Sequence, residues 1–140
     1  MSYHGPSFCG ILKDFNAKTL EDQLDITSSL ESGLSSFNKN VFNNNNEPRF
    51  YERIRTASRT DIGVHATQNA FTFDSPSMET YSTDNIKVGL NKYMYDQKYQ
   101  LRIEKVFQLD DTNFDCRRWA TMREYVYKII IVEPDQYDRV

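Results

Sequence analysis

The chain has 140 residues, of which 39% are hydrophobic and 26% charged, with nine Tyr, nine Phe and one Trp. This composition supplies material for one packed core and excludes a wholly disordered chain. The net charge of −3 excludes a broadly basic surface, so any site for a polyanion must be local. No apolar run approaches the roughly 20 residues that a membrane span needs. We therefore expect no membrane partner.

The first half of the chain predicts a helix, a long loop and a pair of strands. In residues 19–37 the apolar side chains recur near the helical period, and acidic residues lie in the first turn. Six of the nine residues 38–46 are Asn, which favours turns and an exposed loop. Residues 51–56 alternate apolar and charged side chains, and residues 69–74 have the composition of a second strand. The loop 58–66 would join the two strands into an antiparallel pair.

The second half predicts another helix and two more strands. Residues 83–94 place their apolar side chains on one helical face, with Thr83 or Asp84 as the cap. Residues 99–109 and 125–132 are rich in β-branched and aromatic side chains. The order predicts an α+β fold with a largely antiparallel sheet covered on one face by two helices. A ferredoxin-like arrangement is the leading topology.

One short segment, residues 58–66, combines several chemically useful side chains. It holds the cation Arg59, the hydroxyl of Thr60, the carboxylate of Asp61 and the imidazole of His65. Arg59 and Asp61 are two positions apart, so both side chains can project the same way in an extended geometry. The guanidinium would then keep the carboxylate ionised or bind a phosphate beside it. Such a carboxylate is a candidate nucleophile.

A structural interpretation of the same segment stays open. Asp61 and Thr60 would bond to backbone amides in a loop between two strands, and Gly63 would supply a positive φ. Arg59 would then form an ion pair exposed to solvent.

Two basic stretches also stand out in this acidic chain. The first contains Arg49, Arg53, Arg55 and Arg59, and the second contains Arg117, Arg118, Arg123 and Lys128 among the aromatics Trp119, Tyr125 and Tyr127. If the two stretches converge, they predict a local surface that contacts phosphates and stacks on bases. The alternative is that both are ordinary strand faces whose cations pair with acids elsewhere.

Neither a metal nor a cofactor is indicated. His4 and His65 have no Cys or second His at ligand spacing, and no glycine-rich phosphate loop or dinucleotide motif occurs. No apolar signal segment precedes Cys9 and Cys116, so we expect free thiols in a reducing compartment, where they act as small core side chains.

Two motifs resemble those of a known family. Residues 58–66, Ser-Arg-Thr-Asp-Ile-Gly-Val-His-Ala, resemble the active-site motif of the TruA family of tRNA pseudouridine synthases. Residues 114–127 are similar to a second family segment, Phe-x-Ala-Arg-x-x-Ala-x-x-Arg-x-Tyr-x-Tyr, with its spacing intact. Weaker similarities near residues 3–10, 19–24 and 89–91 extend the resemblance over nearly the whole chain.

The chain also departs from the family pattern. Ser58 stands where bacterial members usually have Gly, and in this respect the motif resembles that of the eukaryotic pseudouridine synthase-like members. Cys116 replaces an Ala, His4 an Asp and Ile11 a Trp. Family members have two related α/β halves with the cleft between them, and this chain resembles only the first.

The resemblance implies a role for each matching residue. Asp61 would be the nucleophile, Arg59 its ion-pair partner and a contact to the substrate, and Tyr125 the aromatic that packs on the target base. The other substrate-binding residues implied are Thr60, His65, Arg117 and Arg123.

The resemblance further implies that residues 1–140 form the N-terminal α/β domain of a pseudouridine synthase, a truncated or fragmentary form without its C-terminal half. The implied reaction isomerises uridine to pseudouridine in the anticodon arm of tRNA, without a cofactor. The implied partner is the anticodon stem-loop, and a homodimer is one option. The protein would be intracellular, in the cytoplasm or in mitochondria.

Two other functions stay open. A non-catalytic RNA-binding fragment would keep half of the fold without closing a cleft. A plain α+β interaction domain would have no nucleic acid partner.

Overall fold

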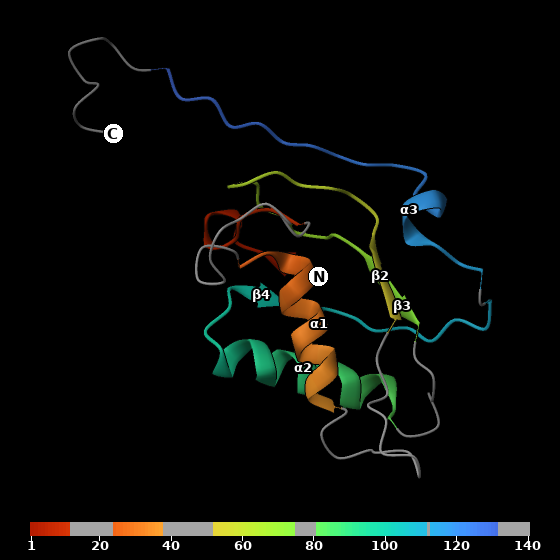
Figure 1. The fold of residues 1–140 in the computed structure, drawn as a ribbon. Coiled ribbons are helices and arrows are strands. Elements are labelled where there is room, and N and C mark those ends of the chain that lie inside the picture. Colours follow the sequence, from red (N-terminus) through yellow and green to blue (C-terminus); the bar gives the residue numbers. More distant parts are fainter. Residues whose placement is uncertain (12–23, 38–51, 75–80, 112, 132–140) are drawn as a thin grey trace.

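The computed structural model describes residues 1–11, 24–37, 52–74, 81–111 and 113–131. In chain order the elements are β1 (Ser2–Tyr3), the 3-10 turn η1 (Gly5–Ser7), α1 (Ile26–Phe37), β2 (Glu52–Thr56), β3 (Phe71–Asp74), α2 (Thr83–Asp96), β4 (Leu101–Arg102) and α3 (Cys116–Trp119). Figure 1 shows α2 running below the strands and α1 crossing it, with the chain after α3 passing above the strands. No helix in these described segments is long and apolar enough to cross a membrane.

The strands form two antiparallel pairs, β1 with β4 and β2 with β3. Backbone hydrogen bonds join the pairs, because Met1 exchanges bonds with Asn69 at 2.8 Å and Tyr3 with Ala66 at 2.9 and 3.2 Å. Asn69 lies two residues before β3, so the strand order across the joined sheet is β4, β1, β3, β2. This order, with one helix after β1 and one after β3, is the expected ferredoxin-like arrangement. The α+β prediction is therefore confirmed.

Helix α1 begins at Ile26 because Asp25 caps it. The Asp25 carboxylate accepts hydrogen bonds from the Ser28 amide at 2.7 Å and the Ser28 hydroxyl at 2.5 Å. The predicted helix began at residue 19, but residues 24 and 25 are not helical, so that prediction is wrong at these two positions. Residues 19–23 lie outside the described residues.

Helix α2 matches its predicted position but has a different cap. Ser82, rather than Thr83 or Asp84, accepts the Asn85 amide at 3.2 Å. The helix continues past the predicted end at residue 94 to Asp96 and ends where Lys98 adopts a φ of 59°. A left-handed residue there stops the helix and returns the chain to β4.

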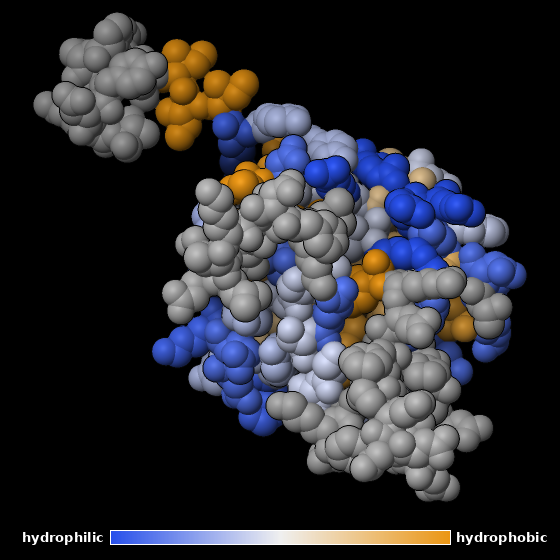
Figure 2. Space-filling view, viewed as in Figure 1, coloured by the Kyte–Doolittle hydropathy of each residue, from blue (hydrophilic) through white to orange (hydrophobic). Residues whose placement is uncertain are grey.

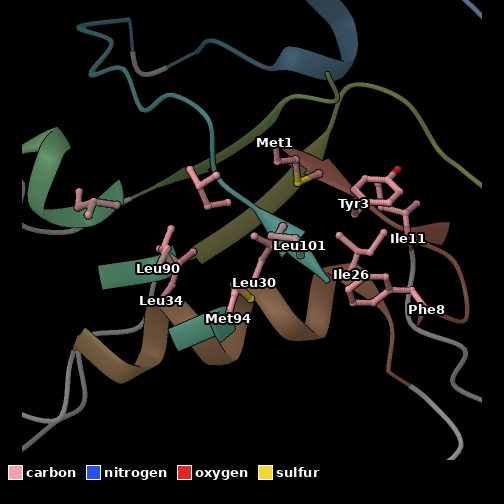
Figure 3. Packing of buried hydrophobic residues seen from close by; sticks show 12 residues of the cluster. Met1, Tyr3, Phe8, Ile11, Ile26, Leu30, Leu34, Leu90, Met94 and Leu101 are labelled. Carbon is pink, nitrogen blue, oxygen red and sulfur yellow. The ribbon is translucent and has the colours of Figure 1, made fainter. Parts of the chain in front are cut away.

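The core lies between the two helices and the sheet (Figure 3). Leu30 and Leu34 of α1 and Leu90 and Met94 of α2 are each at most 1% exposed. The helices cross closely at Gly33, where a Cβ would lie 3.0 Å from Leu90 Cδ2. The other members of the buried cluster are Met1, Tyr3, Phe8, Ile11, Ile26, Ile86, Leu101 and Ile103.

One predicted strand is shorter than expected, and another does not form over its described residues. Only Leu101–Arg102 of residues 99–109 pairs as a strand, and residues 125–131 pair with no strand among the residues described. The exposed fractions of Ile129, Ile130 and Ile131 are 83%, 75% and 93%. β propensity alone does not make a strand, because the ladder requires a neighbour. Residues 38–46, 51 and 132 lie outside the described residues.

Candidate functional site

The loop of residues 58–66, called here the Asp61 loop, packs directly on the turn η1. A Cβ on Gly5 would overlap the backbone of Gly63 and Val64, so only glycine allows this approach. Gly63 itself has a φ of 81°, and the Val64 amide donates to the Asp61 carbonyl at 3.3 Å. The loop therefore turns sharply just after Asp61.

Buried hydrogen bonds hold the start of the loop. Thr60 Oγ1 lies 2.7 Å from Tyr3 Oη, which also accepts a bond from Asn69 Nδ2 at 3.2 Å. Asn69 further bonds to the Ser58 carbonyl at 2.9 Å and to the Ser58 amide at 3.3 Å. Thr60 and Asn69 are only 9% and 7% exposed. Thr60, the residue that precedes Asp61, is thus held to the sheet by its bond to Tyr3.

The side chains of Arg59 and Asp61 are exposed on either side of this fixed residue. Among the described residues neither side chain has a hydrogen bond or an ion pair, and the expected pair between Arg59 and Asp61 does not form. An exposed carboxylate on a braced turn is accessible to a ligand from solvent. Of the structural interpretation, the positive φ of Gly63 is present. The Thr60 hydroxyl, however, bonds to the Tyr3 hydroxyl and not to a backbone amide.

The segment of residues 114–127, called here the second-motif segment, reaches the Asp61 loop from the far end of the chain. Tyr125 Oη lies 3.1 Å from Ser58 Oγ. Arg123 donates to the Ala57 carbonyl from Nε at 2.9 Å and from Nη2 at 2.7 Å. Figure 1 shows this part of the chain passing over the connection between β2 and β3. The two motifs therefore meet at the start of the Asp61 loop, at Ala57 and Ser58.

The start of the second-motif segment is anchored on the β2–β3 pair. Asp115 caps α3 by accepting the Arg117 amide at 2.9 Å, and its carboxylate also lies 3.7 Å from Arg55 Nε of β2. Cys116 is buried beneath α3, where its thiol donates to the Arg55 carbonyl at 3.2 Å and accepts from Thr72 Oγ1 at 3.7 Å. These contacts set the direction in which the chain leaves α3.

Electrostatics at this anchor favour a charged Asp115 and a neutral Cys116. Desolvation raises the pKa of the Asp115 carboxyl, but the Arg117 amide and the guanidinium groups of Arg117, Arg55 and Arg118 outweigh it, so the pKa lies below its ordinary value. Burial raises the pKa of the Cys116 thiol. Cys116 is thus a packing group rather than a nucleophile, as expected. Neither Cys9 nor Cys116 forms a disulfide. Cys9 is exposed, so its prediction as a core residue is wrong.

The two histidines of the chain meet at the other side of the loop. The rings of His4 and His65 are 4.7 Å apart in an edge-to-face arrangement, and His4 Nδ1 lies 3.1 Å from Ser7 Oγ. Both residues are exposed. Within the described parts of the chain, no group of three or more His, Cys, Asp or Glu side chains is placed to hold a metal ion.

The basic side chains are partly brought together. Arg55, Arg117 and Arg118 surround Asp115, and Arg123 Nη2 also bonds to the Arg117 carbonyl at 3.2 Å. Arg49 and the side chain of Arg53 lie outside the described residues. Arg123 is thus bound to backbone on both sides, whereas Arg117 and Arg118 remain 62% and 78% exposed.

Sequence reasoning missed the residues that position the Asp61 loop. Tyr3, Gly5 and Asn69 brace it, yet residues 3–5 gave only the composition of a turn and a weak family similarity. Two signals could have indicated these contacts. Gly5 allows a close approach of another backbone, and the hydroxyl of a buried Tyr on a strand requires a hydrogen-bond partner.

Comparisons with known proteins agree with the two motifs. A tRNA pseudouridine synthase A from Dictyoglomus thermophilum is 29% identical over 129 residues, which cover 92% of this chain and 44% of the relative. The same-named proteins of Bartonella quintana and Neorickettsia sennetsu are 27% and 30% identical, over 93% and 92% of this chain and 45% of each relative. No protein-family model matches the chain.

These similarities confirm the resemblance to the TruA family and extend it over nearly the whole chain. The chain spans less than half the length of the curated relatives it matches.

Proposed function

We propose that this chain is the part of a tRNA pseudouridine synthase that carries the catalytic aspartate. The observation that supports this most directly is the meeting of the two motifs, since Tyr125 lies 3.1 Å from Ser58, three residues before Asp61. A loop with a purely structural role would not need an aromatic from a segment 67 positions away. This contact supports a site in which a carboxylate, a ring face and exposed cations act together.

Asp61 is proposed as the nucleophile. Conversion of uridine to pseudouridine breaks the bond between N1 and C1′, turns the uracil and forms a bond between C5 and C1′. The proton on C5 is lost and N1 gains one, so no electrons are transferred overall and the reaction needs no redox cofactor. An ionised carboxylate that attacks the sugar or the base holds the two parts together between these steps. The exposed side chain of Asp61 on a fixed turn suits this role.

Tyr125 and the arginines are proposed to hold the substrate. A uridine must leave its stack before its glycosidic bond is accessible, and an aromatic face stabilises the extruded base. Tyr125 is 55% exposed and its hydroxyl is held by Ser58, so its ring is available to a base. Arg59 and Arg117 are exposed and suit phosphate contacts, whereas Arg123 positions the segment through its bonds to Ala57.

Thr60 and His65 are proposed to act from the Asp61 loop itself. Thr60 positions the loop through Tyr3, and His65 presents an exposed ring next to His4. His65 is therefore the better candidate of the two for a direct contact with RNA.

The proposed substrate is a uridine in the anticodon arm of tRNA, modified in the cytoplasm or in mitochondria. We further propose that residues 1–140 are the N-terminal domain and that a second half closes the cleft. The relatives are about twice as long as this chain, which leaves room for that half. Assembly as a homodimer is part of the same proposal.

The test is the variant Asp61→Asn in the longest open reading frame that contains these residues. The substitution keeps the volume and removes the charge, so fold and RNA affinity should be unchanged while pseudouridine formation in a tRNA transcript is lost. Asp110→Asn, at another exposed aspartate, is the control and should be fully active. A turnover of one tenth of wild type or more in Asp61→Asn would exclude the nucleophile role.

A further inference from the structure

Helix α3 carries an exposed aromatic that the proposed catalytic roles leave unused. Trp119, the only tryptophan of the chain, is 62% exposed at the end of α3. Its ring lies 6.0 Å from that of Phe114 with a tilt of 31°, so one face of the indole is supported from within the segment. A large aromatic in water is unfavourable unless something covers it.

The platform below Trp119 is rigid. The Asp115 carboxylate accepts a hydrogen bond from the Arg117 amide. The Asp115 carbonyl accepts hydrogen bonds from the amides of Arg118 and Trp119, at 2.9 and 3.0 Å. Cys116 is 6% exposed against β2 and β3. The position of the indole is therefore fixed by the sheet, although its ring faces solvent, which reduces the entropy lost when a ligand stacks on it.

The surroundings of Trp119 are cationic. Arg117 and Arg118 have exposed guanidinium groups on the same short helix. The side chain of Asp115, the N-cap of this helix, is only 10% exposed and is already shared among three arginines. A ligand at this surface therefore meets an indole face and two positive charges, the combination that binds a base and its phosphates.

The same segment connects this surface to the proposed catalytic site. Tyr125 follows Trp119 by six residues, which span at most about 20 Å in a fully extended chain. Arg123 lies between the two aromatics and is bonded both to Arg117 and to Ala57. One strand of RNA can therefore contact both aromatics.

We propose that Trp119, with Arg117 and Arg118, forms a second subsite that stacks an unpaired base of the RNA whose target uridine lies at Asp61. The position of this subsite relative to the target uridine rests on the proposed function. Stacking on Trp119 itself requires only a single-stranded nucleotide. A protein partner is less suited, because the exposed neighbours of Trp119 on α3 are charged rather than apolar.

The experiment uses the 140-residue chain and the fluorescence of its single tryptophan. A single-stranded uridine hexamer should quench that fluorescence, whereas a duplex RNA of equal length should quench it much less because its bases are already stacked. In Asp61→Asn the quenching should be unchanged. Loss of catalysis and loss of the subsite are thereby measured separately, since pseudouridine formation is assayed in the longer reading frame.

Variants at Trp119 test the ring itself. Binding of an end-labelled uridine hexamer, followed by anisotropy, should weaken roughly 5-fold or more in Trp119→Ala and stay within about 3-fold in Trp119→Phe. Phe107→Ala removes an aromatic that is 73% exposed outside this region and is the matched control, with no expected effect. Circular dichroism at equal concentration verifies that each variant is folded.

Three outcomes would overturn the subsite. Equal affinity of Trp119→Ala and wild type would show that the indole contacts no base. Equal quenching by duplex and single strand would leave only phosphate attraction. A tryptophan spectrum that responds to protein concentration but not to RNA would show that a second copy of the chain covers this surface.

Discussion

Tyr125 Oη and Ser58 Oγ lie 3.1 Å apart, although the two residues are 67 positions apart in the chain. Both residues are exposed or half-buried, so the bond contributes little to stability but sets the direction of the Tyr125 ring. The bond uses the hydroxyl of Ser58, which a glycine at this position would lack.

Substitutions at Tyr125 should separate ring from hydroxyl. Tyr125→Ala should weaken RNA binding by roughly 5- to 100-fold, because stacking on one base contributes about 1–3 kcal/mol. Tyr125→Phe should retain most of the affinity, since the ring remains and only the bond to Ser58 is lost. Titration of a labelled anticodon-arm RNA measures both. If Phe were as damaging as Ala in a folded variant, the hydroxyl and not the ring would be the working group.

Thr60→Val should destabilise the Asp61 loop by about 1–2 kcal/mol, because it removes a hydrogen bond from the buried Tyr3 hydroxyl. Thr67→Val, at an exposed threonine of the next turn, is the control and should stay within about 0.5 kcal/mol of wild type. Urea unfolding gives both values. Equal stabilities of the two variants would mean that the bond to Tyr3 does not hold the loop.

Gly5→Ala should be more harmful than Gly63→Ala. A methyl group at position 5 meets the backbone of Gly63 and Val64, so the turn after Asp61 must move, whereas nothing lies within 4 Å of a Cβ at position 63. Gly63→Ala should cost only its left-handed backbone, about 1–2 kcal/mol. Thermal unfolding compares the two. The reverse order would show that η1 and the Asp61 loop are not in contact.

The sequence was most informative where a pattern is local. The helix α2 and the β2–β3 pair follow from side-chain periodicity, and the motif of residues 58–66 is visible as a run of nine residues. The start of α1 at Ile26 was missed because residues 19–25 share the helical pattern, which only the cap at Asp25 interrupts. The braces from Tyr3 to Thr60 and from Arg123 to Ala57 join residues 57 and 66 positions apart. No local pattern encodes such pairs.

Stability should fall in acid through Asp115. Its folded pKa lies below the ordinary Asp value of 3.8, so its stabilising contribution is present above 3.8 and is lost as the pH falls through the folded pKa. Asp115→Asn should be less stable than wild type at neutral pH and should lose less stability below pH 3.8. Asp110→Asn, at an exposed aspartate, is the control. Parallel stability curves of Asp115→Asn and wild type in acid would contradict this assignment.

The 140-residue chain alone should bind RNA but form no pseudouridine. Arg117 and Arg118 are exposed and attract phosphates without a closed cleft, so the logarithm of the affinity should fall linearly with the logarithm of salt concentration, by about 0.7 for each phosphate contacted on a single strand. Catalysis requires the carboxylate in a closed, preorganised site, and Asp61 is exposed here. Multiple turnover on an anticodon-arm transcript would show that the chain is a minimal enzyme.

The chain alone should also self-associate through residues 126–131. Val126, Tyr127 and the three isoleucines 129–131 are each at least 74% exposed and have no neighbouring strand within the described part of the fold. Figure 2 shows orange, hydrophobic atoms standing away from the body of the molecule on this extended segment. An exposed, unpaired apolar strand pairs readily with another copy.

Ile130→Lys should therefore shift the chain towards monomer, because a charge on an unpaired strand opposes pairing. Val88→Lys, at a residue that is 67% exposed on α2, adds the same charge outside this segment and should leave the association unchanged. Sedimentation velocity over a range of concentrations measures the oligomeric state of both variants. If Val88→Lys dissociated the chain as well as Ile130→Lys does, net charge rather than residues 126–131 would control assembly. A wild-type chain that stays monomeric at high concentration would show that the exposed isoleucines do not pair.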